Sequence, residues 1–169
     1  MTRMTEMTGL GSLKRRALAA LAAMMILASA LTGYAAEAPK AGFTYNKIRY
    51  SVGMDANTAR QTLGEAKSSR DVNNCANGYI NKAYTYGETG DFEVLIEQNE
   101  AGQEVISNIT LLTGQVATEE GLRVGDPESR ITALYPTARK GLSTYTVIMG
   151  TGTLYIKTKA GKISFISYI

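Results

Sequence analysis

Hydrophobic and polar side chains alternate along two neighbouring segments in the middle of the chain. In DFEVLIEQ (91–98) apolar residues alternate with glutamates, and in EVISNITLL (104–112) we expect Val105, Ile109 and Leu111 to share one side. The intervening NEAG has the composition of a turn. Because successive side chains of a strand point to opposite faces, the two segments predict an antiparallel hairpin with one face against a core.

Three further strand patterns occupy the end of the chain. The segments STYTVIM (143–149), LYIKT (154–158) and ISFISYI (163–169) are rich in β-branched and aromatic residues, and the turns GTGT and KAGK separate them. Tyr155 is out of phase with the apolar residues on either side of it, which should line the core. We therefore expect Tyr155 to project outward from the sheet.

Two helices are predicted, one before each group of strands. In GMDANTARQTLGEA, Asp55 is placed to cap the first turn and Gly64 to end the last one. In the second helix, Asp126 takes the capping position and Pro127 the first helical turn, and an apolar stripe continues up to Pro136. Both helices are short, so packing rather than intrinsic propensity must stabilise them.

The two helices begin within similar stretches, VGMDANTARQTLGEA and VGDPESRITALYPTA, which contain Gly53 and Gly125. A plan of strand, helix and strands therefore occurs twice, over about 47–113 and 118–169. Between the first helix and the hairpin, residues 65–87 are rich in Ser, Asn and Gly. They are predicted to form an irregular excursion that ends in a strand.

This order of elements predicts the fold class. Residues 47–169 are expected to form a single α+β domain, a tandem repeat of a short helix plus antiparallel strands, with the helices packed on one face of the sheet. The mature chain of about 130 residues is long enough for one domain with its own core.

The N-terminal segment 1–35 has the plan of a secretory signal peptide. A basic group at 14–16 precedes an uncharged apolar run, Ala17–Leu31, and small residues follow. The run of roughly 15 residues is shorter than the ~20 that span a bilayer core, so a cleaved signal is the main prediction and an uncleaved anchor the alternative. LTGY is similar to a bacterial lipobox in which Tyr34 replaces the lipidated cysteine, which excludes lipidation there. Residues 36–46 are predicted to be a flexible leader.

The charge balance excludes one class of partner. The chain has 18 basic and 15 acidic residues, but four basic residues and one acidic residue precede Gly33, which leaves 14 of each. A near-neutral mature chain without a basic stripe and interleaved aromatics predicts no nucleic-acid binding. We expect a secreted or extracytoplasmic cell-surface protein that contacts the membrane only through its N-terminal segment, if that segment is uncleaved.

Composition also excludes several kinds of chemistry. The chain has no histidine and one cysteine, which excludes the usual histidine-dependent nucleophiles, histidine-ligated zinc and cysteine-rich metal centres. GTGT lies between two strands rather than between a strand and a helix, so it is no phosphate-binding loop. Glu88, Asp91 and Glu93 lack the spacing of a calcium loop. The sequence therefore predicts no catalytic residue, no cofactor, no metal and no enzymatic activity.

The chain has ten tyrosines and no tryptophan. Tyrosines in strands commonly pack across the sheet, whereas an outward-facing tyrosine offers a partner contact area at low entropic cost. Cys75 is interpreted as a buried small hydrophobe, with an intermolecular bridge or a reactive thiol as the alternative. The candidate interaction surface consists of Cys75, Tyr79, Tyr84, Tyr86 and Tyr155.

Two stretches resemble known families. IRYSVGMDANTARQTLGEA (48–66) is similar to the signature of small lipoproteins of the outer-membrane assembly machinery, whose fold is duplicated in secreted β-lactamase inhibitory proteins. NNCANGYINKAYTYG (73–87) and the linker VATEEGLRVGD (116–126) resemble segments of uncharacterised exported proteins and lipoproteins of Gram-positive bacteria. The resemblance covers roughly residues 48–169.

The resemblance implies a β-lactamase-inhibitor-like fold built for contact between proteins, and it transfers no catalytic residue. Two departures from the family pattern are Ala66, where the signature has proline, and Tyr34, where lipoprotein relatives have the lipidated cysteine.

Together these observations predict an exported bacterial protein without enzymatic activity that binds an unknown protein or cell-wall partner. The alternative is a small envelope hydrolase that works with carboxylates alone, because Asp and Glu remain when histidine is absent. Such an enzyme requires two acidic side chains that face each other in a concave site.

Overall fold

Strands dominate the part of the chain that the structure describes. The computed structural model describes residues 41–73 and 80–169. Of these residues, 50% lie in strands and 11% in helices. The predicted α+β class is therefore wrong, and the protein has a mostly β fold. The two described helices have only eight and six residues, so each covers a small part of a large sheet.

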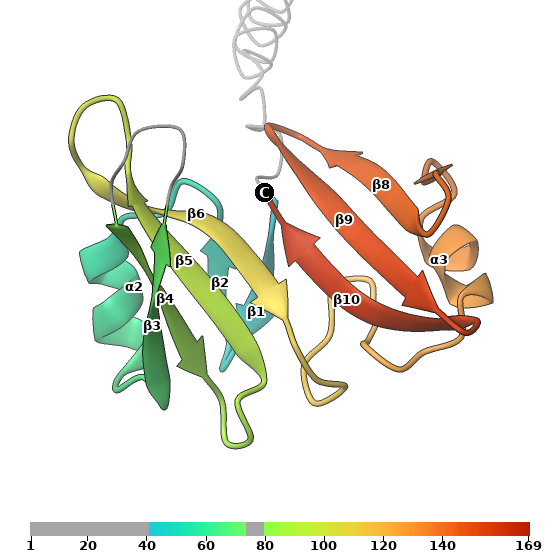
Figure 1. Cartoon of the computed structure of the whole chain (residues 1–169), viewed down its shortest axis with the longest axis horizontal. Coiled ribbons are helices and arrows are strands. Elements are labelled where there is room, and N and C mark those ends of the chain that lie inside the picture. The colour runs from blue at the N-terminus through green and yellow to red at the C-terminus, as the bar shows by residue number, and fades with distance from the viewer. Residues whose placement is uncertain (1–40, 74–79) are drawn as a thin grey trace, which may run out of the picture. The chain divides into compact units, whose positions relative to one another are not determined.

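Eight strands form one antiparallel sheet in the order β3-β4-β5-β6-β10-β9-β8-β7. β6 and β10 end the two halves of the chain, and they lie side by side at the centre of the sheet (Figure 1). The strands of the first half are β3 (Ser68–Asn73), β4 (Ile80–Tyr86), β5 (Phe92–Gln98) and β6 (Glu104–Leu111). Those of the second half are β7 (Arg139–Lys140), β8 (Thr144–Met149), β9 (Gly152–Lys159) and β10 (Lys162–Tyr168).

A second sheet has two strands, β1 (Gly42–Tyr45) and β2 (Ile48–Ser51). Asn46 and Lys47 connect them with φ angles of 49° and 67°. Positive φ at both central residues is typical of the tight hairpin turn that matches the strand twist. Phe43 is fully buried, so the flexible leader predicted up to Asn46 is wrong for this part, which is fixed by strand pairing and burial.

The helix α2 (Ala56–Leu63) confirms the first predicted helix and both of its ends. The Asp55 carboxylate accepts a hydrogen bond from the Thr58 backbone N–H at 2.8 Å and so caps the first turn. Gly64 follows the helix with a φ of 77°, and its N–H donates to the Arg60 carbonyl at 3.0 Å. This left-handed ending is the one that glycine favours.

The helix α3 (Ser129–Leu134) starts later than predicted, and Asp126 does not cap it. The residue before the helix is Glu128, whose side chain makes no capping bond. Asp126 Oδ2 instead accepts hydrogen bonds from the Arg123 backbone N–H at 2.9 Å and from Arg130 Nη1 at 3.0 Å. The Asp126 carboxylate therefore closes the turn before the helix and does not cap the helix N-terminus.

The excursion predicted between α2 and the hairpin contains a regular strand. Ser68–Asn73 pairs residue for residue with β4, from Ser68 opposite Thr85 to Asn73 opposite Ile80. β3 is the edge strand and is largely exposed, so its polar sequence is compatible with the sheet. Cys75 and Tyr79 lie outside the described residues.

The hairpin of β5 and β6 is confirmed, but β6 contains a β-bulge. The register shifts between Leu95 and Ile96, so that Ser107 is an extra residue on β6. The bulge reverses the alternation of faces along β6, so Val105 faces away from the buried Ile109 and Leu111. The prediction that Val105 shares their side is therefore wrong.

The two halves make matching contacts at their first glycines. The Gly53 N–H donates to the Ile106 carbonyl at 2.8 Å, and the Gly125 N–H donates to the Ile163 carbonyl at 2.8 Å. Each isoleucine N–H donates back, at 2.8 Å, to the residue that follows the glycine. A register shift follows the isoleucine in both strands. These matched contacts support the predicted repeat, whose boundaries stay a prediction.

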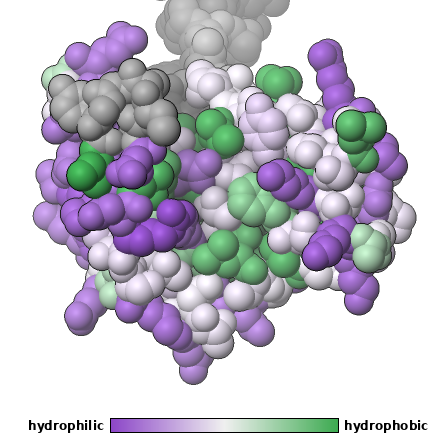
Figure 2. Space-filling model, viewed as in Figure 1, coloured by the Kyte–Doolittle hydropathy of each residue, from purple (hydrophilic) through white to green (hydrophobic). Residues whose placement is uncertain are grey.

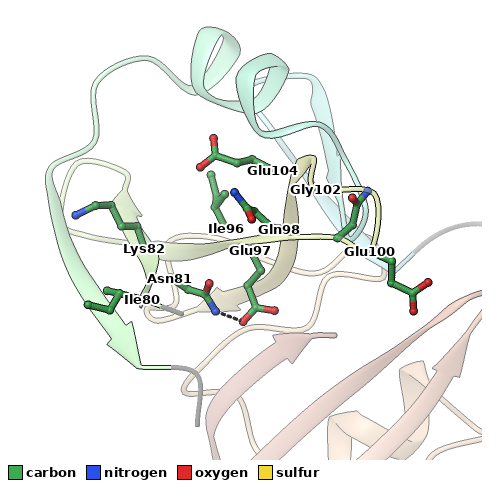
Figure 3. Close-up of a pocket in the computed structure, with 10 residues that line it drawn as sticks. Ile80, Asn81, Lys82, Ile96, Glu97, Gln98, Glu100, Gly102 and Glu104 are labelled. Carbon is green, nitrogen blue, oxygen red and sulfur yellow. Dashed lines mark hydrogen bonds between the residues drawn. The ribbon is translucent and has the colours of Figure 1, made fainter. Parts of the chain in front are cut away.

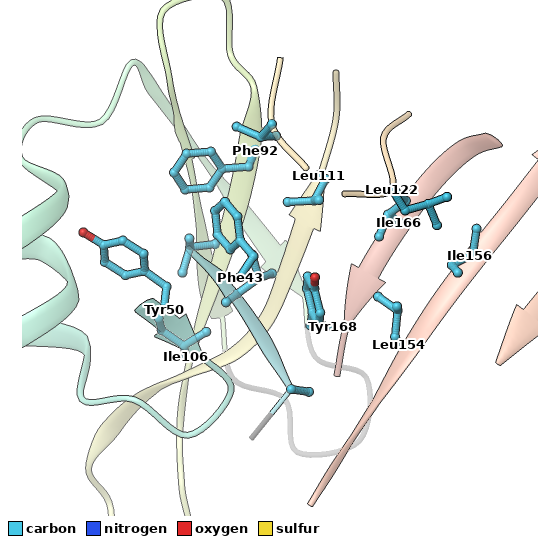
Figure 4. Packing of buried hydrophobic residues seen from close by; sticks show 14 of the residues in the cluster. Phe43, Tyr50, Phe92, Ile106, Leu111, Leu122, Leu154, Ile156, Ile166 and Tyr168 are labelled. Atoms are coloured by element: carbon cyan, nitrogen blue, oxygen red, sulfur yellow. The ribbon is translucent and has the colours of Figure 1, made fainter. Parts of the chain in front are cut away.

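The core lies on one face of the large sheet and continues across both halves. Phe43 of the small sheet packs edge-on against Phe92 with ring centroids 4.9 Å apart, and it stacks on Tyr168 with centroids 6.5 Å apart. Aromatic pairs in such geometries contribute about 0.5–1.5 kcal/mol beyond burial. The part of the core in the second half includes Leu122, Leu154, Ile156 and Ile166 (Figure 4).

Candidate functional site

The large sheet has one face in the core and one face that points away from it. The helices α2 and α3, the small sheet and the segment 112–128 all contribute residues to the same buried cluster, so they pack on the same face. We call the opposite face the open face. Figure 2 shows neutral and hydrophobic side chains over the middle of the face in view and hydrophilic side chains mostly toward its margins.

Strand pairing places one row of open-face side chains across all eight strands. The row begins on edge strand β3, crosses the joint between the halves, and ends on edge strand β7. Its members in spatial order are Ser68, Thr85, Glu93, Thr110, Ser167, Tyr155, Thr146 and Arg139.

A hydroxyl and amide cluster lies at the centre of this row. Thr110 and Ser167 face each other across β6 and β10, with 3.2 Å between their hydroxyl oxygens. Both hydroxyls also donate to Asn108 Oδ1, at 2.9 Å from Thr110 and 3.0 Å from Ser167. Both hydroxyl residues are buried and each donates its one proton within this cluster, and the bond from Ser167 of β10 to Asn108 of β6 joins the halves.

The carboxylates of the open face have partners of their own. Arg70 donates from Nε and Nη2 to the two oxygens of Glu93 at 2.9 and 2.7 Å, and this hydrogen bonding raises the pKa of the Arg70 guanidinium. Asn81 Nδ2 donates to Glu97 Oε1 at 2.7 Å. Each carboxylate therefore ties two strands together, and neither has the other as its partner. These contacts do not favour the hydrolase alternative.

The second half of the open face carries exposed apolar side chains around Thr153 of β9. Ile148 lies opposite Thr153 on β8, and Ile169 exchanges two backbone hydrogen bonds with Thr153 at 2.7 and 2.9 Å. Tyr155 follows two residues along β9. Ile148, Tyr155 and Ile169 are 68%, 36% and 50% exposed. We call these three residues the apolar patch.

The described tyrosines of the predicted interaction surface lie on different faces. Tyr155 is on the open face, because its neighbours along β9 are buried in the core. Tyr84 is half-buried on the other face, with the Arg60 guanidinium 5.5 Å from its ring centroid. Tyr86 is buried against Phe92, with centroids 5.7 Å apart, and burial raises the pKa of its phenol.

Sequence reasoning identified Tyr155 but missed the two isoleucines beside it. Ile148 and Ile169 alternate with the buried residues Val147 and Tyr168. The same phase argument that assigned Tyr155 to the outside would have found both. They were overlooked because apolar residues in a strand are ordinarily assigned to the core.

A cavity of about 600 Å³ lies in the first half of the sheet, beside the turn between β5 and β6 (Figure 3). Its charged side chains Lys82, Glu97 and Glu104 are engaged in ion pairs or hydrogen bonds. Lys82 Nζ lies 2.8 Å from Asp71 Oδ1, and Glu104 Oε2 lies 2.7 Å from Arg60 Nη1. The remaining lining residues include Asn81 with Glu97, and Glu100 at the turn. The lining thus offers paired charges rather than a converging set of reactive groups.

Two further findings concern residues 41–73 and 80–169 alone. Within them, no group of three or more Asp, Glu or Cys side chains could hold a metal ion. No helix in this part of the chain has the length and hydropathy needed to cross a membrane. The predicted signal segment 1–35 lies outside the described residues.

The described fold and site define an antiparallel β-sheet protein with one covered face and one open face. Comparison with protein-family models, curated proteins and solved structures gave no match. The resemblance to exported lipoproteins and β-lactamase inhibitory proteins therefore stays a prediction.

Proposed function

We propose that this protein is an exported binding module without enzymatic activity, which holds a protein or cell-wall partner on the open face of its sheet. The single observation that carries the proposal is the apolar patch. Ile148 of β8 and Ile169, which directly follows β10, flank Thr153 of β9, and Tyr155 is the next residue of β9 on the same face; all three face away from the core. Contiguous exposed apolar side chains with a polar surround are characteristic of interaction sites.

The support beneath the patch suits a binding surface. Backbone pairing to both neighbouring strands holds β9, and Leu154 and Ile156 anchor it from below at 0% exposure. A site on paired strands is positioned more precisely than a site on a loop. Tyr155 adds a ring that loses little entropy when a partner covers it. The patch is therefore preorganised for contact.

A co-sedimentation experiment tests this function. The full chain is mixed with envelope preparations from the organism that makes it, and the bound fraction is compared among variants. Ile148→Ser and Tyr155→Ala should each reduce binding about tenfold, because a buried apolar anchor contributes more than 1 kcal/mol at an interface. Leu142→Ser is the matched control, since Leu142 is fully exposed in a turn away from the patch.

The control should bind as the unmodified chain does. Equal binding by all four proteins, or no binding by the unmodified chain, would contradict the proposal. All the substituted side chains are outside the core cluster, so each variant should fold. Thermal unfolding of each variant checks this, and a loss of binding by a folded variant then reports a lost contact with the partner.

A further inference from the structure

The charges of the chain separate between the two halves of the sheet. From Ser129 to Ile169 the chain has six basic residues and no acidic residue, residues 118–128 have one basic and four acidic residues, and residues 41–117 have six basic and nine acidic residues. The half formed by β7–β10 is therefore the basic one. The balanced total for the mature chain conceals this separation.

Two of the six basic residues are neutralised on the covered side. Arg130 pairs with Asp126 at 3.0 Å, and Lys140 pairs with Glu128 at 2.9 Å. Within residues 41–73 and 80–169, no ion pair engages the other four basic residues, which are all exposed. These four are Arg139, Lys157, Lys159 and Lys162.

Strand pairing places the four charges on the open face. Lys157 and Lys159 alternate with buried Ile156 along β9 and lie roughly 6.6 Å apart along the strand. Lys162 lies opposite Lys159 across the turn to β10. Arg139 ends the row of side chains that contains Tyr155. We call these four residues the basic strip. Its three lysines lie beyond the apolar patch, at the end of β9 and the start of β10, and Arg139 lies on edge strand β7 in the row of Tyr155.

An aromatic ring accompanies the strip. Lys157 Nζ lies 5.4 Å from the centroid of Phe165, which is opposite it on β10 and half-exposed. Tyr155 is the next open-face residue along β9. The strip therefore offers ammonium groups beside aromatic surface, which corrects the expectation that the chain has no basic stripe with aromatics.

We infer that the basic strip binds a linear phosphate-bearing polymer of the cell envelope, and this inference rests on the proposed function because it names the occupant of the same face. Like charges in a row repel each other until a polyanion brings counter-charge along the whole row and releases small counterions. Three of the four groups are lysines. Lysine is depleted at protein–protein interfaces, whereas its ammonium group binds phosphate as a point charge.

Binding to long-chain inorganic polyphosphate tests the inference. The labelled polymer is titrated with the full chain, and anisotropy is measured at low and at physiological ionic strength. The triple variant Lys157→Gln, Lys159→Gln, Lys162→Gln should bind roughly 100-fold more weakly, with a shallower salt dependence, because each lysine near an anionic surface contributes about a fivefold effect.

The matched control removes the same total charge from the first half, through Lys47→Gln, Lys67→Gln and Lys82→Gln. The control should keep nearly full affinity, and thermal unfolding should show that both triple variants remain folded. Equal loss in both would mean that net charge alone governs binding, which overturns the inference.

Two other polyanions test whether the basic strip prefers phosphate groups. Polyglutamate should bind more weakly than polyphosphate, and equal affinity overturns the assignment to phosphate. Single-stranded DNA should bind no tighter than polyphosphate, and much tighter binding overturns the assignment in favour of a nucleic acid. In the envelope experiment, full binding by the strip variant with loss by Ile148→Ser would overturn this inference while the proposed function stands.

Discussion

The hydroxyls of Thr110 and Ser167 lie 3.2 Å apart across β6 and β10, at the joint between the two halves of the sheet. Only three residue pairs form this joint, including Thr110 with Ser167. Both hydroxyls also donate to Asn108, so a small buried network ties the halves together on the open face. On the core face of the same joint, Leu111 lies opposite Ile166 and Ile109 opposite Tyr168, and all four are fully buried.

Removing one hydroxyl should weaken the joint measurably. Ser167→Ala leaves buried Thr110 and half-buried Asn108 without one partner each, which costs about 1–3 kcal/mol of unfolding free energy. Ser68→Ala, on an exposed position of edge strand β3, should cost less than about 0.5 kcal/mol. Urea denaturation of both variants measures the difference. Equal stability would show that the network does not hold the halves together.

The turn between β4 and β5 should tolerate no side chain at Gly87. This residue has a φ of 89°, and a Cβ there would lie 2.3 Å from Asp91 Oδ2. Gly87→Ala should lower the unfolding free energy by about 3 kcal/mol or more, through backbone strain and displacement of the buried carboxylate. Gly102→Ala is the control.

Gly102 has a similar φ of 75° but no atom within 4 Å of the added Cβ. Its substitution should cost only the backbone term of about 1–2 kcal/mol. Thermal melts of the two variants separate the effect of the clash from that of the backbone. A smaller loss in the Gly87 variant would contradict the geometry at Asp91.

Acid should weaken the fold partly through Asp91. Hydrogen bonds from the hydroxyls of Thr89 and Thr113 hold the pKa of this carboxyl below its usual 3.8. A lowered pKa in the folded state stabilises the protein above the ordinary pKa, and this stabilisation is lost as the pH falls through the folded-state pKa. Thr113→Val should therefore cost about 1–2 kcal/mol near pH 7 and much less in strong acid.

Unfolding free energies measured from neutral pH to about pH 2 test this expectation. The curves of the unmodified chain and the Thr113→Val variant should converge as the pH falls. Parallel curves would show that the hydroxyl stabilises the turn independently of the charge on Asp91.

The tyrosines should divide into packing and contact residues. Tyr86 is buried against Phe92, so Tyr86→Ala should cost about 3–5 kcal/mol of stability. Tyr155 is on the open face, so Tyr155→Ala should cost about 1 kcal/mol or less. Calorimetry distinguishes them, and similar losses for both would place Tyr155 in the core.

The elements with local signals were predictable from the sequence. Asp55 and Gly64 bound α2 because capping and left-handed termination depend on a few adjacent residues. Alternation predicted the hairpin of β5 and β6 and the outward position of Tyr155, since phase along a strand is also local. Of the candidate surface, only this one described tyrosine lies on the open face.

Features that depend on distant partners were not predictable. The polar Ser68–Asn73 becomes a strand because β4 offers it an edge, and Asp126 is taken by Arg123 and Arg130 rather than by the helix N-terminus. The bulge at Ser107 inverted the expected face of Val105. In each case an interaction across the fold outweighs a local preference.

The sequence by itself therefore determined the hairpin of β5 and β6, the strands β8 to β10, the ends of α2, the lack of histidine and the separation of charge between the halves. Tertiary structure decided that the protein is mostly β, since eight strands form one continuous sheet that two short helices cover only in part. It also decided that Ile148 and Ile169 flank β9 on the open face, near Tyr155. The physical reason is that alternation assigns a side chain to a face, whereas only strand order and register assign its neighbours.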